Sequence, residues 1–86
     1  MDKPYIEQKI DSSVYVRTFS ETVDDSELQW HWDEEDRIVT PIEKTDWQFQ
    51  FDNELPFTIT KEINIPAGVI HRVIKGTGEL KVKILK

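Results

Sequence analysis

Hydrophobic and polar residues alternate with a period of two along much of the chain, as expected for β-strands that bury one face. Short polar stretches and single glycines or prolines separate these segments and are typical of turns. No window of about eleven residues or more repeats hydrophobic residues at helical spacing, and 24–28 could form at most one helical turn. The predicted strands include 14–19, 45–51, 63–65, 69–74 and 80–84.

Roughly seven or eight short strands, with turns about every ten residues, predict an all-β fold that is either a small sandwich or a closed barrel. We favour a barrel or jelly roll, because closure removes strand edges that so small a sheet could not protect. At 86 residues the chain has room for one hydrophobic core, so we expect a single domain over 1–86.

Composition and charge narrow the classes of function. The chain has no cysteine, so any metal must be bound by His, Asp, Glu or amide groups. The formal net charge of −6 argues against nucleic acid and anionic membranes as partners, since both require clustered lysine and arginine. No apolar run approaches the ~18 residues of a membrane span, and the N-terminal residues lack the order of a signal peptide. We therefore expect a cytoplasmic protein.

Acidic residues are concentrated in residues 21–36, which carry eight of them and no lysine or arginine. A solvated acidic loop explains this composition. An acidic surface that engages a basic protein explains it as well, and would make the chain a protein-interaction domain with salt-sensitive binding. We favour the solvated loop, because such runs are ordinary in soluble domains.

A histidine and an aspartate lie two residues apart in Trp30-His31-Trp32-Asp33. On a strand, His31 and Asp33 would share one face at about 7 Å backbone separation, close enough to bind one ion. A simple hydrogen-bonded pair is the alternative. Trp30 and Trp32 would share the opposite face, where we expect them to be covered by the N-terminal strand around 5–10 or by a second protomer of a homodimer.

The second histidine follows a proline and a glycine in the segment "IPAGVIHRV". Pro66 ends one strand, Gly68 permits the positive φ of a tight turn, and the next strand carries His71. This segment resembles the second conserved motif of the cupin superfamily, Pro-x-Gly-x-x-His. The resemblance covers about 28–85 and implies a small cupin-like jelly roll, also called a double-stranded β-helix barrel, with His71 delivered into the barrel to bind a metal.

The first cupin motif, His-x-His followed three or four residues later by Glu, is degraded in this chain. His31 matches, but Asp33 replaces the second histidine, and the glutamate position falls at Arg37 or Ile38. Asp36 is the nearest carboxylate and a candidate additional ligand. Arg37 could form an ion pair with Asp36 that stabilises the turn, which we favour, or hold an anionic ligand at the cavity mouth.

The donors that remain are His31, Asp33 and His71, a set that resembles the two-histidine-one-carboxylate triad of Fe(II) and 2-oxoglutarate oxygenases. Those enzymes are usually much longer chains, which argues against an oxygenase here. Imidazole and carboxylate together suit Fe(II), Mn(II), Ni(II) or Zn(II).

Two glutamines could also line the pocket. Gln48 and Gln50 share one face of the predicted strand 45–51, and three aromatic residues share the other face: Trp47, Phe49 and Phe51. If the aromatics fill the barrel, the glutamines are outside. If the aromatics pack elsewhere, the glutamines line the cavity and Gln48 could complete the metal site. The sequence leaves this choice open.

We therefore expect a small cupin-like protein that binds a divalent metal through His31, Asp33 and His71 in a barrel pocket and takes a small polar or sugar-like ligand. The sequence leaves open whether the protein is an enzyme. The alternatives are a noncatalytic binding or assembly module of the same fold without metal, and the acidic protein-interaction domain.

Overall fold

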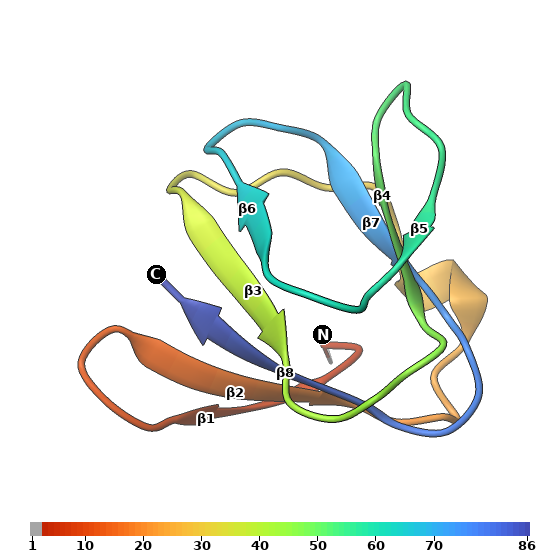
Figure 1. Cartoon of the computed structure of the whole chain (residues 1–86), viewed down its shortest axis with the longest axis horizontal. Coiled ribbons are helices and arrows are strands. Elements are labelled where there is room, and N and C mark those ends of the chain that lie inside the picture. Colours follow the sequence, from red (N-terminus) through yellow and green to blue (C-terminus); the bar gives the residue numbers. More distant parts are fainter. Residues whose placement is uncertain (1–2) are drawn as a thin grey trace.

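The computed structural model describes residues 3–86, in which eight strands form two antiparallel sheets (Figure 1). A single turn of 3-10 helix, Asp25–Glu27, follows the second strand. The strands are β1 (Ile6–Lys9), β2 (Val14–Phe19), β3 (Arg37–Pro41), β4 (Gln48–Phe51), β5 (Phe57–Thr58), β6 (Ile63–Ile65), β7 (His71–Ile74) and β8 (Leu80–Leu85). The predicted all-β fold is confirmed. No helix of residues 3–86 is long and apolar enough to cross a membrane.

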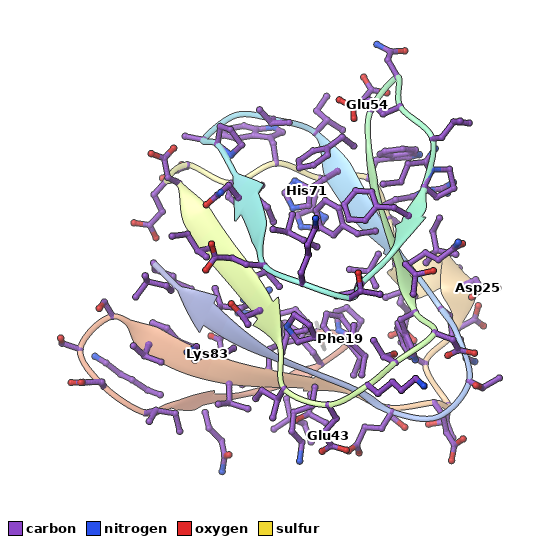
Figure 2. The ribbon with its side chains drawn as sticks, in the orientation of Figure 1. Phe19, Asp25, Glu43, Glu54, His71 and Lys83 are labelled. Atoms are coloured by element: carbon purple, nitrogen blue, oxygen red, sulfur yellow. The ribbon has the colours of Figure 1, made fainter. Side chains whose placement is uncertain are left out.

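The larger sheet has the strand order β1-β2-β8-β3-β6, and the smaller sheet has the order β5-β4-β7. β8 is the central strand of the larger sheet and pairs with both β2 and β3. Figure 1 shows the two sheets on opposite sides of a common interior. Figure 2 shows Phe19 and His71 within that interior and Lys83 and Glu43 at the periphery.

The alternation of the sequence explains the core. Along β8, Leu80, Val82 and Ile84 are buried, while Lys81 and Lys83 between them are half-buried and exposed. The same rule applies along β6 and β4. The buried hydrophobic residues are Phe19, Val23, Val39, Trp47, Phe49, Ile59, Ile63, Ile65, Leu80, Val82 and Ile84.

Trp47, just before β4, decides which face of this strand is inside. Its side chain is fully buried, and its indole Nε1 donates a hydrogen bond to the Gly78 carbonyl at 3.0 Å. Phe49 is buried beside it, so Gln48 and Gln50 lie on the outer face. Of the two alternatives for this strand, the aromatic interior is the one observed, because indole and phenyl rings bury far more apolar surface than amides.

Two segments are less regular than their patterns suggest. Residues 28–33 do not form a continuous strand, and only His31 pairs, in an isolated antiparallel bridge with His71. The predicted strand 69–74 begins at His71, because the turn that contains Gly68 extends to Val69. Ile70, before the strand, is 41% exposed, so this segment is not covered on both sides.

Candidate metal centre

The isolated bridge brings the two histidines together. The backbone N–H of His31 donates to the carbonyl of His71 at 3.0 Å, and the N–H of His71 donates to the carbonyl of His31 at 2.9 Å. Residues directly opposite in an antiparallel pair project their side chains to the same face. The two imidazole rings accordingly lie with their centroids 4.3 Å apart.

Backbone carbonyls orient both rings in the same way. Nδ1 of His31 lies 3.0 Å from the carbonyl oxygen of Gln29, and Nδ1 of His71 lies 2.8 Å from that of Val69. A carbonyl can only accept, so each Nδ1 donates its proton and the Nε2 of the neutral ring keeps a free lone pair. A hydrogen bond from the ring nitrogen that does not bind the metal is the usual way in which metal-binding histidines are held.

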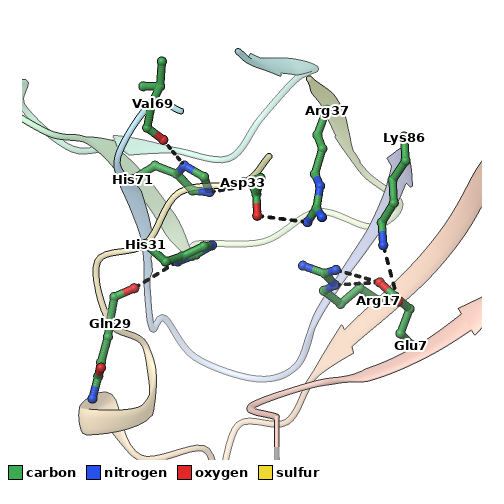
Figure 3. A network of polar contacts seen from close by, with 9 residues as sticks. All are labelled: Glu7, Arg17, Gln29, His31, Asp33, Arg37, Val69, His71 and Lys86. Atoms are coloured by element: carbon green, nitrogen blue, oxygen red, sulfur yellow. Dashed lines mark hydrogen bonds and ion pairs between the residues drawn. The ribbon is translucent and has the colours of Figure 1, made fainter. Parts of the chain in front are cut away.

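Asp33 completes the cluster (Figure 3). Its Oδ2 lies 3.4 Å from Nε2 of His71, and each of the three side chains offers one donor atom within 4.8 Å of the others. Two donors that are each about 2.1 Å from one ion can be at most about 4.2 Å apart. The 3.4 Å between Asp33 and His71 is already within this limit. Any further approach of the donors to one ion would therefore be a movement of the exposed His31 side chain. The donor set therefore fits a first-row divalent metal.

Burial keeps His71 in the form that can bind a metal. The side chain is buried, and this desolvation lowers its pKa; the hydrogen bond with Val69 and the charge of Asp33 oppose the shift, while His31 and Arg37 add to it. The pKa stays below its usual value of 6.5. The ring of His71 is consequently neutral at neutral pH, as a metal ligand must be.

The turn before His71 is tied to the segment of Asp33. Gly68 has a φ of +78° and its N–H donates to the carbonyl of Asp33 at 2.8 Å. The N–H of Ala67 donates to Oδ1 of Asp36 at 2.8 Å. Asp36, a candidate additional ligand, therefore anchors the Pro66–Gly68 turn and is not among the pocket-lining residues.

Arg37 pairs with a different carboxylate from the one expected. Its Nη1 lies 3.2 Å from Oδ1 of Asp33, so the predicted pair with Asp36 is wrong. The physical reason is that Asp36 already accepts from the turn, whereas Arg37 at the start of β3 faces the interior. Arg37 Nε is buried without a hydrogen-bond partner in the described chain.

A pocket of about 310 Å³ lies between the sheets, and His31, Asp33, Arg37 and His71 are part of its lining. Most of the remaining wall is hydrophobic. It includes Phe19, Leu28, Val39, Phe49, Ile65 and Val82. The cluster is thus a polar site in an apolar cavity, the usual setting of a small-molecule site.

Arg17 was missed by reasoning from the sequence. It lines the same pocket and is 8% exposed. The sequence does carry a signal for it. Arg17 and the hydrophobic Phe19 are two residues apart on β2 and so share the inner face.

Gln50 and Arg72 lie outside the pocket, as does Gln48. Nε of Arg72 donates to Oε1 of Gln50 at 2.9 Å, and the guanidinium stacks over the ring of Trp30 at 4.5 Å. Trp30 is 41% and Trp32 57% exposed. The expected cover by the N-terminal strand is absent from the described residues, because β1 pairs with β2.

Comparison with known proteins gives matches in structure and none in sequence. No protein-family model and no curated protein matches this chain. A cupin-2 domain protein from Shewanella frigidimarina matches 100% of this chain and 83% of its own length at 16% identity, with a TM-score of 0.64. A cupin domain from Bordetella pertussis matches 99% of this chain and 96% of its own at 20% identity, with a TM-score of 0.60.

A third match is a cupin 2 conserved barrel domain protein from Leptotrichia buccalis. It covers 95% of this chain but 40% of its own, at 19% identity and a TM-score of 0.68. Likeness at this level of identity shows the fold and leaves the activity to be argued from the site.

Proposed function

Starting from the cupin fold of this chain, we propose that the protein binds one divalent metal ion through His31, Asp33 and His71 and holds a small molecule beside it. The observation that carries the proposal is the convergence of three donor atoms within 4.8 Å, with both histidines oriented through Nδ1. The hydrophobic pocket around the donors supports the small-molecule part.

Each side chain of the cluster would contribute one ligand atom. Nε2 of each histidine and Oδ2 of Asp33 would hold the ion, which as Fe(II), Mn(II), Ni(II) or Zn(II) would supply Lewis-acid or redox chemistry. Three protein ligands leave coordination positions open. The hydrophobic residues around the donors would strengthen the electrostatic contacts made there.

A metal-free binding module of the same fold is the second candidate. One observation favours it: Nη1 of Arg37 already lies 3.2 Å from Oδ1 of Asp33. This arrangement gives the carboxylate a counter-charge without any ion. Under this candidate the pocket would take a ligand, and metals would have no effect on it.

Elemental analysis distinguishes the two candidates. The full chain would be purified without a metal-binding affinity tag, reconstituted with each of the four metals, and compared with His31→Ala and His71→Ala. We expect one ion per wild-type chain and at least about a hundredfold weaker binding in each variant, because each loses a direct ligand. Asp36→Asn is the matched control outside the ligand set and should retain the ion.

Absence of metal from the wild-type chain after reconstitution with all four ions would overturn the proposal. Equal binding by the wild type and both histidine variants would place the ion elsewhere and overturn it as well.

A further inference from the structure

The charge of the pocket and its hydrophobic walls together restrict the ligand. Resting on the metal site proposed above, we propose that the ligand is a small organic carboxylate with a compact hydrophobic body, and that its carboxylate contacts both the metal and Arg37. The metal and the carboxylate would then bind cooperatively. Four observations support this.

The first observation is the charge balance of the site. Asp33 carries one negative charge, and Arg37 neutralises it at 3.2 Å. Both histidines contribute neutral nitrogen donors. A divalent ion bound here would therefore leave its two positive charges without a counter-charge from the three ligands and Arg37. Uncompensated charge is costly in an apolar cavity, so the site with metal favours an anion.

The second observation is that the other charged groups of the lining do not supply this counter-charge. Arg17 lines the pocket but is neutralised by Glu7, whose Oε1 accepts hydrogen bonds from its Nε and Nη2. Lys3 and Glu27 also line the pocket, with opposite charges. The excess positive charge therefore stays at the metal and Arg37.

The third observation is the unused hydrogen-bonding capacity of Arg37. A guanidinium has five N–H donors, yet among residues 3–86 Arg37 makes one ion pair, through Nη1, and its buried Nε has no partner. Buried unpaired donors are rare in proteins and call for an explanation. A planar carboxylate can accept two parallel hydrogen bonds from one edge of a guanidinium, and a small rotation of Arg37 would present Nε and an Nη group to it.

The fourth observation is the nature of the wall. Most of the wall of the cavity of about 310 Å³ is hydrophobic and includes Phe19, Val39, Phe49 and Val82, which offer no partner to the hydroxyl groups of a sugar. The same wall suits a phenyl ring or a short branched alkyl chain. We therefore favour a hydrophobic carboxylate over the sugar-like ligand expected from the sequence.

Calorimetric metal titrations test the proposal, with benzoate as the probe. The titrations would use the metal that the wild-type chain keeps after reconstitution. The affinity of the full chain for this metal would be measured without additive, with benzoate, and with benzamide, which has a similar shape but no charge. We expect benzoate at saturation to tighten metal binding about tenfold or more and benzamide to leave it unchanged. The size follows from one charge-assisted contact, and reciprocity requires metal to tighten benzoate binding equally.

Arg37→Met should abolish the benzoate effect, while Arg72→Met, which removes an arginine outside the pocket, should retain it. Without benzoate, Arg37→Met should bind metal at least as tightly as the wild type, because a positive charge beside the ion is gone. Thermal melting of each variant checks that it folds. If Arg37→Met does not fold, the comparison of benzoate with benzamide on the wild type still tests whether the site recognises a carboxylate.

The outcomes separate this inference from the proposed function. Metal bound with an affinity that benzoate leaves unchanged would overturn the inference and leave the metal site standing. An equal effect of benzamide would overturn it too, because charge would not be recognised. If Arg37→Met and Arg72→Met lost the benzoate effect equally, the loss would not be specific to Arg37, and the proposed contact between Arg37 and the carboxylate would be wrong. Absence of metal in every titration would overturn the proposed function and this inference with it.

Discussion

Arg17 and Arg37 both line the pocket, but their surroundings differ (Figure 3). Arg17 donates twice to Oε1 of Glu7, at 3.0 Å from Nε and 2.6 Å from Nη2, and its guanidinium stacks 3.8 Å from the ring of Tyr5. Lys86 reaches the other oxygen of Glu7 at 3.7 Å. Within the described part of the chain, Arg37 has one ion pair and an Nε without a hydrogen-bond partner.

The difference separates a stabilising cluster from a binding cluster. The Arg17 cluster pairs Nε and Nη2 of Arg17 with Glu7, so its contribution is to the fold. In the Arg37 cluster the ion pair with Asp33 is present, but the buried Nε of Arg37 has no hydrogen-bond partner among residues 3–86. A buried arginine thus indicates a binding site when its N–H donors lack partners, and its position in the pocket alone does not indicate one.

Removal of Arg17 should give the largest loss of stability. Arg17→Met leaves Glu7 partly buried and without its main counter-charge, so we expect the free energy of unfolding to fall by about 3 kcal/mol. Urea denaturation measures this. Added metal should stabilise Arg17→Met and the wild type equally and so leave the difference between them unchanged, because no metal donor touches this cluster. A variant as stable as the wild type would show that the cluster does not stabilise the fold.

Removal of Arg37 should give a smaller loss that metal reverses. Arg37→Met deprives Asp33 of its counter-charge but also removes a buried unpaired donor, so we expect a loss of about 2 kcal/mol without metal. An ion bound at Asp33 would replace the missing charge, so Arg37→Met should gain more than the ~2.7 kcal/mol that a hundredfold excess of metal over its Kd gives the wild type, and the difference between them should shrink. Thermal melting with metal and then with chelator measures both states.

Failure of metal to restore the Arg37 variant while it stabilises the wild type would contradict this contrast between the two clusters. The contrast would also be contradicted if metal reduced the stability difference between Arg17→Met and the wild type as much as it reduced that of Arg37→Met.

The smallest expected effect is a dependence on pH at Glu7. Burial opposes the shift, but the hydrogen bond and charge of Arg17, with Lys86 and Lys3, hold the pKa of Glu7 below its usual value of 4.5. A carboxyl group with a lowered pKa in the folded state contributes stability above its unfolded pKa and loses it as the pH falls through the folded value.

The wild type should therefore exceed Glu7→Gln by about 1 kcal/mol in free energy of unfolding at pH 7, and the difference should shrink below about pH 4.5. Urea denaturation over this range measures the difference. A gap that is constant with pH would show that Glu7 contributes through packing alone.

Strand positions and the candidate ligands could be predicted because they depend on local pattern. Alternation places strand 14–19 correctly and starts the last strand at Leu80. His31 and Asp33 were expected on one face of a strand, and they do converge with His71, although residues 28–33 form no continuous strand. Alternation tells which residues share a face, however, and not which face is inside, so the outward position of Gln48 and Gln50 had to come from the structure.

The partners of Arg37 and Asp36 could not be predicted for a related reason. Both lie where a turn meets β3, and the direction of a side chain there depends on the turn, which has no period. The exchange of hydrogen bonds between His31 and His71 is equally invisible in the sequence, because one isolated bridge leaves no repeating pattern.

The position of β8 in the larger sheet has a consequence for how the chain folds. The central strand of that sheet is the last in sequence, and it alone joins the β1–β2 hairpin to β3 and β6. The two halves of the sheet therefore stay unconnected until β8 pairs with both. Pairings between residues so far apart in sequence are formed slowly, since a long loop must close before any contact is gained. During synthesis on the ribosome, the interior that contains Arg37 and His71 can be closed only after residues 80–85 have emerged.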